Sequence, residues 1–141
     1  MRPAALLDVN VLLALAWPNH QHHRAAHAWF RREGGDGWAT CALTQLAFIR
    51  LSSNPAYTPA PVMPREAAAL LTQLTAHGSH HYWASLAEPA DVGFERALGH
   101  KQVMDAYLVS VAERHRGRLV TFDRRTAVHA GSPGAVQVIS G

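Results

Sequence analysis

Short apolar runs alternate with amphipathic stretches along most of this chain. The first run, residues 4–7, ends at Asp8, and residues 11–15 are again apolar. A short strand is apolar on both faces when helices cover both sides of its sheet, as they do in a parallel sheet. Residues 4–7 are therefore predicted to form a buried strand, and residues 11–15 a helix that packs on that sheet.

The same alternation continues to the end of the chain. Helical spacing of apolar residues predicts further helices, which cover residues 20–33, 44–51, 64–77 and 102–115, a short stretch after Asp123, and one turn at 94–98. Short runs predict strands over residues 38–41, 118–122 and 135–139, and the aromatic-rich residues 80–83 are expected to form another strand. The proline-rich residues 55–64 are expected to form an exposed connection within one domain. Strands that alternate with helices favour the α/β class with a parallel sheet.

Helical spacing also predicts which side chains face the core. In the helix over 44–51 these include Leu46 and Phe48, and in the helix over 102–115 they include Met104, Tyr107 and Leu108. The large aromatic side chains are expected in the core rather than as stacking platforms for RNA bases. They are Trp29, Trp38 and Phe48.

Length and composition narrow the picture. A chain of 141 residues is expected to form a single domain, residues 1–141. Charged residues make up 16% of the chain, below the roughly one quarter that is typical, which suggests that a partner covers part of the surface. The net charge of +3 is compatible with a polyanionic partner such as RNA but does not require one.

The expected location is a reducing cytoplasm. Cys41 is the only cysteine, so the sequence contains neither a disulfide framework nor a cysteine-based zinc site. No apolar stretch approaches the length of a membrane span. Asp8 and Asn10 would interrupt the apolar core of a signal peptide, so the start of the chain is expected to belong to the mature protein.

Three acidic residues are expected at one edge of the predicted sheet. Asp8 and Asp123 each follow a strand, and Asp105 lies in the first turn of the helix before the strand at 118–122. In a parallel sheet, strand ends and helix starts meet at the edge where α/β proteins bind ligands. Helix capping explains Asp8 or Asp123 taken alone, and the helix dipole explains Asp105. Their convergence is better explained by a functional site.

Three carboxylates held together repel one another, and burial raises their pKa values unless a cation balances them. Mg²⁺ or Mn²⁺ takes oxygen ligands and binds substrate phosphate. One or two such ions activate water and stabilise the leaving oxygen of a phosphodiester. The glycines at 34–37 lack the lysine and hydroxyl of a P-loop, so they offer no competing phosphate site.

Three segments of the chain resemble the motifs of PIN-domain ribonucleases. They are residues 7–12 (LDVNVL), 99–108 (GHKQVMDAYL) and 119–123 (LVTFD). Over nearly its whole length the chain is similar to the VapC toxins of VapBC toxin–antitoxin pairs. The resemblance implies a three-layer α/β/α sandwich around a central parallel sheet, and Mg²⁺- or Mn²⁺-dependent cleavage of RNA. It also implies a homodimer and inhibition by a VapB-like antitoxin.

The resemblance also assigns roles by position. Asp8, Asp105 and Asp123 match metal-binding acids, and Asn10 and Thr121 match polar residues that support them.

The sequence departs from the family at one position. The family usually has a glutamate after a Thr or Ser in the helix that follows the second strand, whereas here Thr44 is followed by Gln45. A glutamine carbonyl can still accept a hydrogen bond from metal-bound water, but one negative charge is lost. Weaker metal binding is therefore expected. A PIN-like module that binds RNA or protein without turnover is the alternative function.

Other polar residues leave choices open. His100, Lys101 and Arg124 are candidate contacts to RNA phosphate, although surface solubility explains them almost as well. His23 and His27 share a helix face at ligand-like spacing, and a solvated helix face is favoured over a zinc site.

A metal-dependent phosphatase ranks last among the enzymatic readings. Such an enzyme needs a second Asp two residues after the first, and Asn10 stands there.

Overall fold

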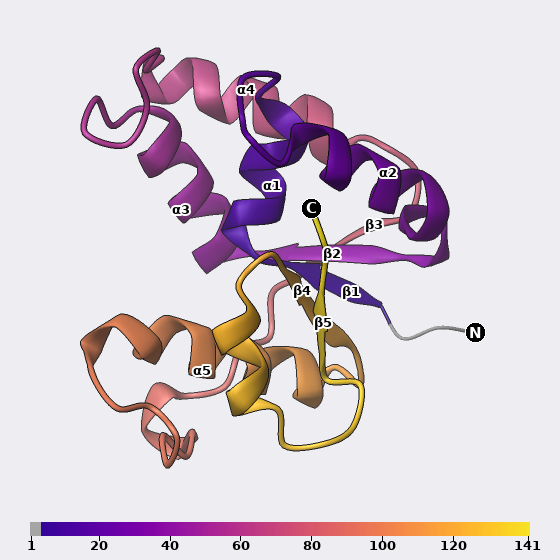
Figure 1. Cartoon of the computed structure of the whole chain (residues 1–141), viewed down its shortest axis with the longest axis vertical. Coiled ribbons are helices and arrows are strands. Elements are labelled where there is room, and N and C mark those ends of the chain that lie inside the picture. Colours follow the sequence, from indigo (N-terminus) through magenta and orange to yellow (C-terminus); the bar gives the residue numbers. More distant parts are fainter. Residues whose placement is uncertain (1–3) are drawn as a thin grey trace.

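The computed structural model describes residues 4–141 (Figure 1). Within them the chain forms a five-stranded sheet in the order β3-β2-β1-β4-β5, and every neighbouring pair is parallel. The strands are β1 (Ala5–Leu7), β2 (Trp38–Cys41), β3 (His80–Trp83), β4 (Arg118–Thr121) and β5 (Val136–Val138).

Helices cover both faces of this sheet, and the predicted three-layer α/β/α sandwich is confirmed. One layer contains α1 (Val9–Ala16), α2 (His23–Glu33), α3 (Ala42–Ser52) and α4 (Pro64–Thr75). The layer on the other side contains α5 (Val103–Arg114) (Figure 1). Short 3₁₀ helices complete the described elements: η1 (Gly34–Asp36), η2 (Pro89–Asp91), η3 (His100–Gln102) and η4 (Arg124–His129).

The alternation of side chains along β1 explains why the whole strand is apolar. Ala5 and Leu7 pack in the core beneath α1–α4, whereas Leu6 packs in the core beneath α5. All three side chains are fully buried, because successive residues of a strand point to opposite faces. The predicted core aromatics Trp29, Trp38 and Phe48 are also fully buried.

Two predicted core positions are wrong. Leu46 of α3 is 63% exposed, and Met104 of α5 is 46% exposed. Helical spacing identifies residues that share a face, but it does not say how far the opposing layer extends. Met104 lies in the first turn of α5 beside Val103, which is also exposed.

Two local predictions are also corrected. The helical turn expected at 94–98 is a hydrogen-bonded turn, in which the amide of Ala97 donates to the carbonyl of Phe94, and the 3₁₀ turn lies earlier, at Pro89–Asp91. His23 and His27 do not form a solvated face. Their rings lie 2.7 and 2.8 Å from the carbonyl oxygens of Ala14 and Leu15, at the end of α1 where helix carbonyls lack partners.

None of the helices described in residues 4–141 is long and apolar enough to cross a membrane.

Candidate active site

The carboxyl ends of β1 and β4 lie side by side at the centre of the sheet. Leu7 is opposite Val120, and the amide of Asp8 donates to the Val120 carbonyl oxygen at 2.9 Å. This register brings Asp8 next to Thr121. The Thr121 hydroxyl donates to Oδ2 of Asp8 at 2.8 Å, and the other carboxylate oxygen accepts from the amide of Val9, also at 2.8 Å.

Thr121 connects Asp8 to the other polar groups at this edge. Its Oγ1 accepts from Nδ2 of Asn10 at 3.0 Å and from the amide of Asp123 at 3.1 Å. Asn10 also accepts, through Oδ1, from the amide of Phe122 at 3.3 Å. One hydroxyl group thus uses both its donor and its acceptor capacity to link residues more than 100 positions apart in the chain.

Asp8 is a buried carboxylate with an unusually high proton affinity. Only 6% of the residue is exposed. Its pKa is raised from 3.8 to about 6, mainly by burial and also by the negative charges of Asp105 and Asp123, against the hydrogen bonds from Thr121 and Val9, which lower it. The electrostatic coupling indicates that the three predicted acids share one neighbourhood.

The other two acids have different surroundings. Asp105, in the first turn of α5, is half-buried, and burial followed by the charge of Asp123 raises its pKa, while His129 and Arg125 lower it. Asp123 has a lowered pKa, mainly because Arg125 donates to it. The Arg125 guanidinium reaches both carboxylate oxygens of Asp123 at 3.2 Å.

A small cavity of about 170 Å³ opens beside Asp105 and Asp123. The positively charged Lys101 and Arg125 line it, together with Gln102 and His129. Lys101 was a predicted phosphate contact. From the sequence, Arg125 next to the acidic site either steers RNA or pairs a carboxylate, and here it is paired with Asp123. His129 gave no sequence signal, because the turns of η4 bring it to the cavity.

The other two predicted phosphate contacts lie outside this cavity. His100 and Arg124 are exposed and are not among its lining residues. Their role stays a prediction.

Gln45 is held by a short chain of hydrogen bonds to β2 and β3. Its Nε2 donates to Oγ1 of Thr40 at 2.9 Å, and this oxygen is 2.8 Å from Nε2 of His80 on β3. Burial and the neighbouring His81 lower the pKa of His80, which favours the neutral ring that accepts the Thr40 proton. The amide of Gln45 is therefore fixed by its nitrogen, and its predicted role toward a metal-bound water stays a prediction.

The donor groups fit a hard divalent cation. Among residues 4–141, no three carboxylate, imidazole or thiol side chains are gathered closely enough to hold an ion as they stand, and Asp123 is paired with Arg125. Yet Asp8 and Asp105 both have raised pKa values, mainly through burial; the charges of Asp105 and Asp123 add to the rise at Asp8, and that of Asp123 to the rise at Asp105. Carboxylate oxygens that carry uncompensated negative charge are the ligands that Mg²⁺ and Mn²⁺ prefer.

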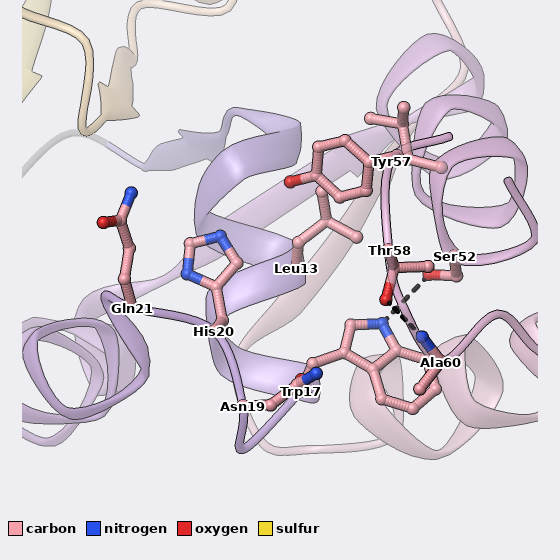
Figure 2. A pocket seen from close by; sticks show the side chains of 10 residues that line it. Leu13, Trp17, Asn19, His20, Gln21, Ser52, Tyr57, Thr58 and Ala60 are labelled. Atoms are coloured by element: carbon pink, nitrogen blue, oxygen red, sulfur yellow. Dashed lines mark hydrogen bonds between the residues drawn. The ribbon is translucent and has the colours of Figure 1, made fainter. Parts of the chain in front are cut away.

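A second pocket, of about 260 Å³, lies apart from these acids (Figure 2). Its walls come from the ends of α1 and α3 and from the connection at 57–60, and Figure 2 shows Tyr57 and His20 at its sides. Trp17 closes one side and donates from Nε1 to the Ser52 hydroxyl at 3.0 Å. None of the predicted site residues lines it.

Comparison with known proteins identifies the family. Residues 5–131 match the model of the PIN domain. The chain belongs to the PIN-domain family. This PIN domain is 42% identical over 139 residues to "Ribonuclease VapC39" of Mycobacterium tuberculosis, covering 96% of this chain and 99% of that protein. It is 43% identical over 136 residues to "Ribonuclease VapC44" of the same organism, covering 94% of each.

A solved structure supports the same assignment. The protein PAE2754 from Pyrobaculum aerophilum matches this PIN domain with a TM-score of 0.60 and 25% identity, over 96% of this chain and 84% of that one.

The raised pKa of Asp8 predicts a specific dependence of stability on pH. In metal-free buffer the folded chain keeps the Asp8 proton up to about pH 6, whereas the unfolded chain releases it near 3.8. The folded state binds more protons between these values, so the free energy of unfolding should fall as pH rises through this window, by about 2–3 kcal/mol. Urea denaturation of the wild type with a chelator present measures it.

Asp8→Asn is the matched control for that measurement, since it keeps the side-chain shape and removes the charge. The variant should be the more stable chain at about pH 7 and close to the wild type at about pH 4. Subtracting the two curves removes the contribution of the histidines. Parallel curves across the window would show that Asp8 ionises normally.

Proposed function

We propose that this chain is a divalent-metal-dependent endoribonuclease of the VapC type, and that residues 1–141 form one PIN domain. The observation that carries the proposal is the convergence of Asp8, Asp105 and Asp123 at the carboxyl edge of the sheet, where the charges of the other two acids add to the raised pKa of the buried Asp8. Similarity over almost the whole chain to proteins named ribonucleases supports the choice of RNA as substrate.

Asp8, Asp105 and Asp123 are the residues that would hold Mg²⁺ or Mn²⁺. When bound, such an ion supplies Lewis-acid activation of water and offsets the charge that develops on the leaving oxygen of a phosphodiester. The chain itself fixes the ligands. Thr121 and the Val9 amide hold one oxygen of Asp8 each, and Asn10 holds Thr121, so the Asp8 carboxylate cannot rotate freely.

The cationic residues beside the acids would bind the substrate. Lys101 and Arg125 line the cavity at Asp105, where a phosphate would offset their charge. Arg125 pairs with Asp123, so we propose that it moves from the carboxylate to substrate phosphate when a cation takes its place. His100 and Arg124, both exposed, would contact RNA farther from the cavity.

The proposal extends to partners and location. Relatives named VapC imply a VapB-like antitoxin as the protein partner. Apolar side chains are exposed at the start of α5: Leu98 is 90% exposed, and Val103 and Met104 are close by in sequence. Exposed apolar surface of this kind supports a protein interface, and we propose that a homodimer covers it. The cytoplasm suits a chain whose single cysteine, Cys41, is buried and unpaired.

Replacing Asp105 tests the mechanism. Asp105→Asn should lower the rate of RNA cleavage in Mg²⁺ or Mn²⁺ by about a hundredfold or more, because it removes one charged ligand. The fold should persist, since burial and repulsion already disfavour the charged form of Asp105. Cleavage of total RNA, followed on gels and normalised to folded protein, provides the measurement.

Asp36→Asn is the control for that experiment, because Asp36 is exposed in η1, just before β2 and so at the opposite edge of the sheet. It should cleave RNA like the wild type. An Asp105→Asn variant that keeps full activity would contradict the proposed mechanism.

One observation favours the alternative of a binding module without turnover: Gln45 contacts Thr40, and a neutral amide stands where the family has a fourth acid. Gln45→Glu should therefore strengthen Mn²⁺ binding, by roughly tenfold for one added carboxylate, and should raise cleavage. Calorimetric Mn²⁺ titration and the RNA assay measure the two effects. A wild type that binds RNA but cleaves none in either metal, and gains activity only as Gln45→Glu, would establish the alternative.

A further inference from the structure

A cavity of about 390 Å³ adjoins the candidate active site along α5. It lies between the segment that follows η2, one side of α5 and the end of η4, and its polar lining includes Glu95, Arg96, Ser110 and Glu113. His129 lines both this cavity and the smaller one that contains Asp105 and Asp123. A bound RNA strand could therefore place its scissile phosphate in one cavity and an adjacent nucleotide in the other.

We propose that this cavity receives the base of the nucleotide next to the scissile phosphate and that it favours guanine. The inference rests on the proposed function, because it takes single-stranded RNA as the ligand. A base must be unstacked to enter such a site, as occurs when proteins read single-stranded RNA. The cavity is large enough for a purine, since ligand pockets begin at roughly 300 Å³.

The two carboxylates exclude the RNA backbone from this cavity. Glu95 and Glu113 contribute carboxylates, which only accept hydrogen bonds. They repel phosphate, and they attract a neutral group that presents N–H donors. The buried apolar side chains Val92 and Ala106 add a surface for the face of a ring.

Two polar groups of the cavity, Arg96 and Glu113, are held in place before any ligand arrives. Nη1 of Arg96 donates to the carbonyls of Val128 and Ala130 at 3.2 and 3.0 Å, which leaves its Nε and Nη2 hydrogens for a ligand. Oε2 of Glu113 accepts from the Gly131 amide and the Ser132 hydroxyl, both at 3.1 Å.

Glycines allow both carboxylates to approach the backbone. A Cβ added at Gly93 would collide with Oε1 of Glu95, and one at Gly131 would lie 2.9 Å from Oε2 of Glu113. Any other residue at either position would push the carboxylate out of its place. Both carboxylates line the cavity: Glu113 is half-buried, whereas Glu95 is exposed to solvent.

Guanine complements this set of groups best. Its N1–H and N2–H donors lie on one edge and match a carboxylate, while its O6 and N7 acceptors lie on another and match an arginine. Cytosine and adenine each present a single amino group as donor on that edge. A pocket with Arg96 and two glutamates can therefore form hydrogen bonds with more of the donors and acceptors of guanine than with those of any other base.

Mapping the cut sites of the full-length protein tests the inference. Single-stranded RNA of randomised sequence is digested with Mn²⁺, and the ends are sequenced. Wild type should show guanine enriched at one position next to the cut. Glu95→Gln and Glu113→Gln, which keep shape and lose charge, should each reduce the enrichment by roughly tenfold. Glu88→Gln, an exposed residue outside the cavity, should leave it unchanged.

A binding experiment without metal separates this inference from the proposed function. Guanosine 5′-monophosphate should bind the wild type roughly tenfold tighter than cytidine 5′-monophosphate, and Glu95→Gln should abolish the difference. Nuclear magnetic resonance shifts at Ser110 and Gly131 report the site. If the wild type cleaves no RNA but binds guanosine selectively, the nuclease proposal fails and the base site stands. Cleavage without base preference, or with a preference that both variants retain, overturns the base site alone.

Discussion

The buried carboxylate of Asp8 is the constraint on which the site depends. It lies at the seam between β1 and β4, where the sheet is covered on both faces and water is largely excluded. Two hydrogen bonds, from Thr121 and the Val9 amide, do not offset its desolvation, so its pKa rises to about 6. A group of this kind destabilises the fold when charged, unless a cation compensates it.

The neighbouring acids increase this imbalance. Asp105 and Asp123 each add negative charge near Asp8, and the described contacts balance only Asp123, through Arg125. Negative charges that lie close together at the edge of a parallel sheet repel one another, and this repulsion favours the binding of a cation there. The PIN-domain arrangement thus follows from the strand order: β1 and β4 must be neighbours for Asp8, Thr121 and Asp123 to meet.

The parts that were predictable from sequence follow from local pattern and parallel topology. Short strand-like runs located all five strands, although β3 (His80–Trp83) is not apolar, and the rule that parallel strands end at one edge located Asp8 and Asp123. The hydrogen bonds that join Gln45 to Thr40 and Thr40 to His80 could not be predicted, because they depend on the register of β2 with β3. The exposure of Leu46 and the position of His129 depended on how far each layer extends and how η4 turns. The spacing of residues along the sequence indicates neither the register of neighbouring strands nor the extent of each helical layer.

The central claim is that three carboxylates form one site for a divalent ion. Carboxyl-carbon magnetic resonance during a Mn²⁺ titration tests it most directly, because the paramagnetic ion broadens only nearby signals. The side-chain signals of Asp8, Asp105 and Asp123 should broaden together at the first additions, and excess Mg²⁺ should restore them. Broadening at other acids first, with these three signals unchanged, would contradict the account.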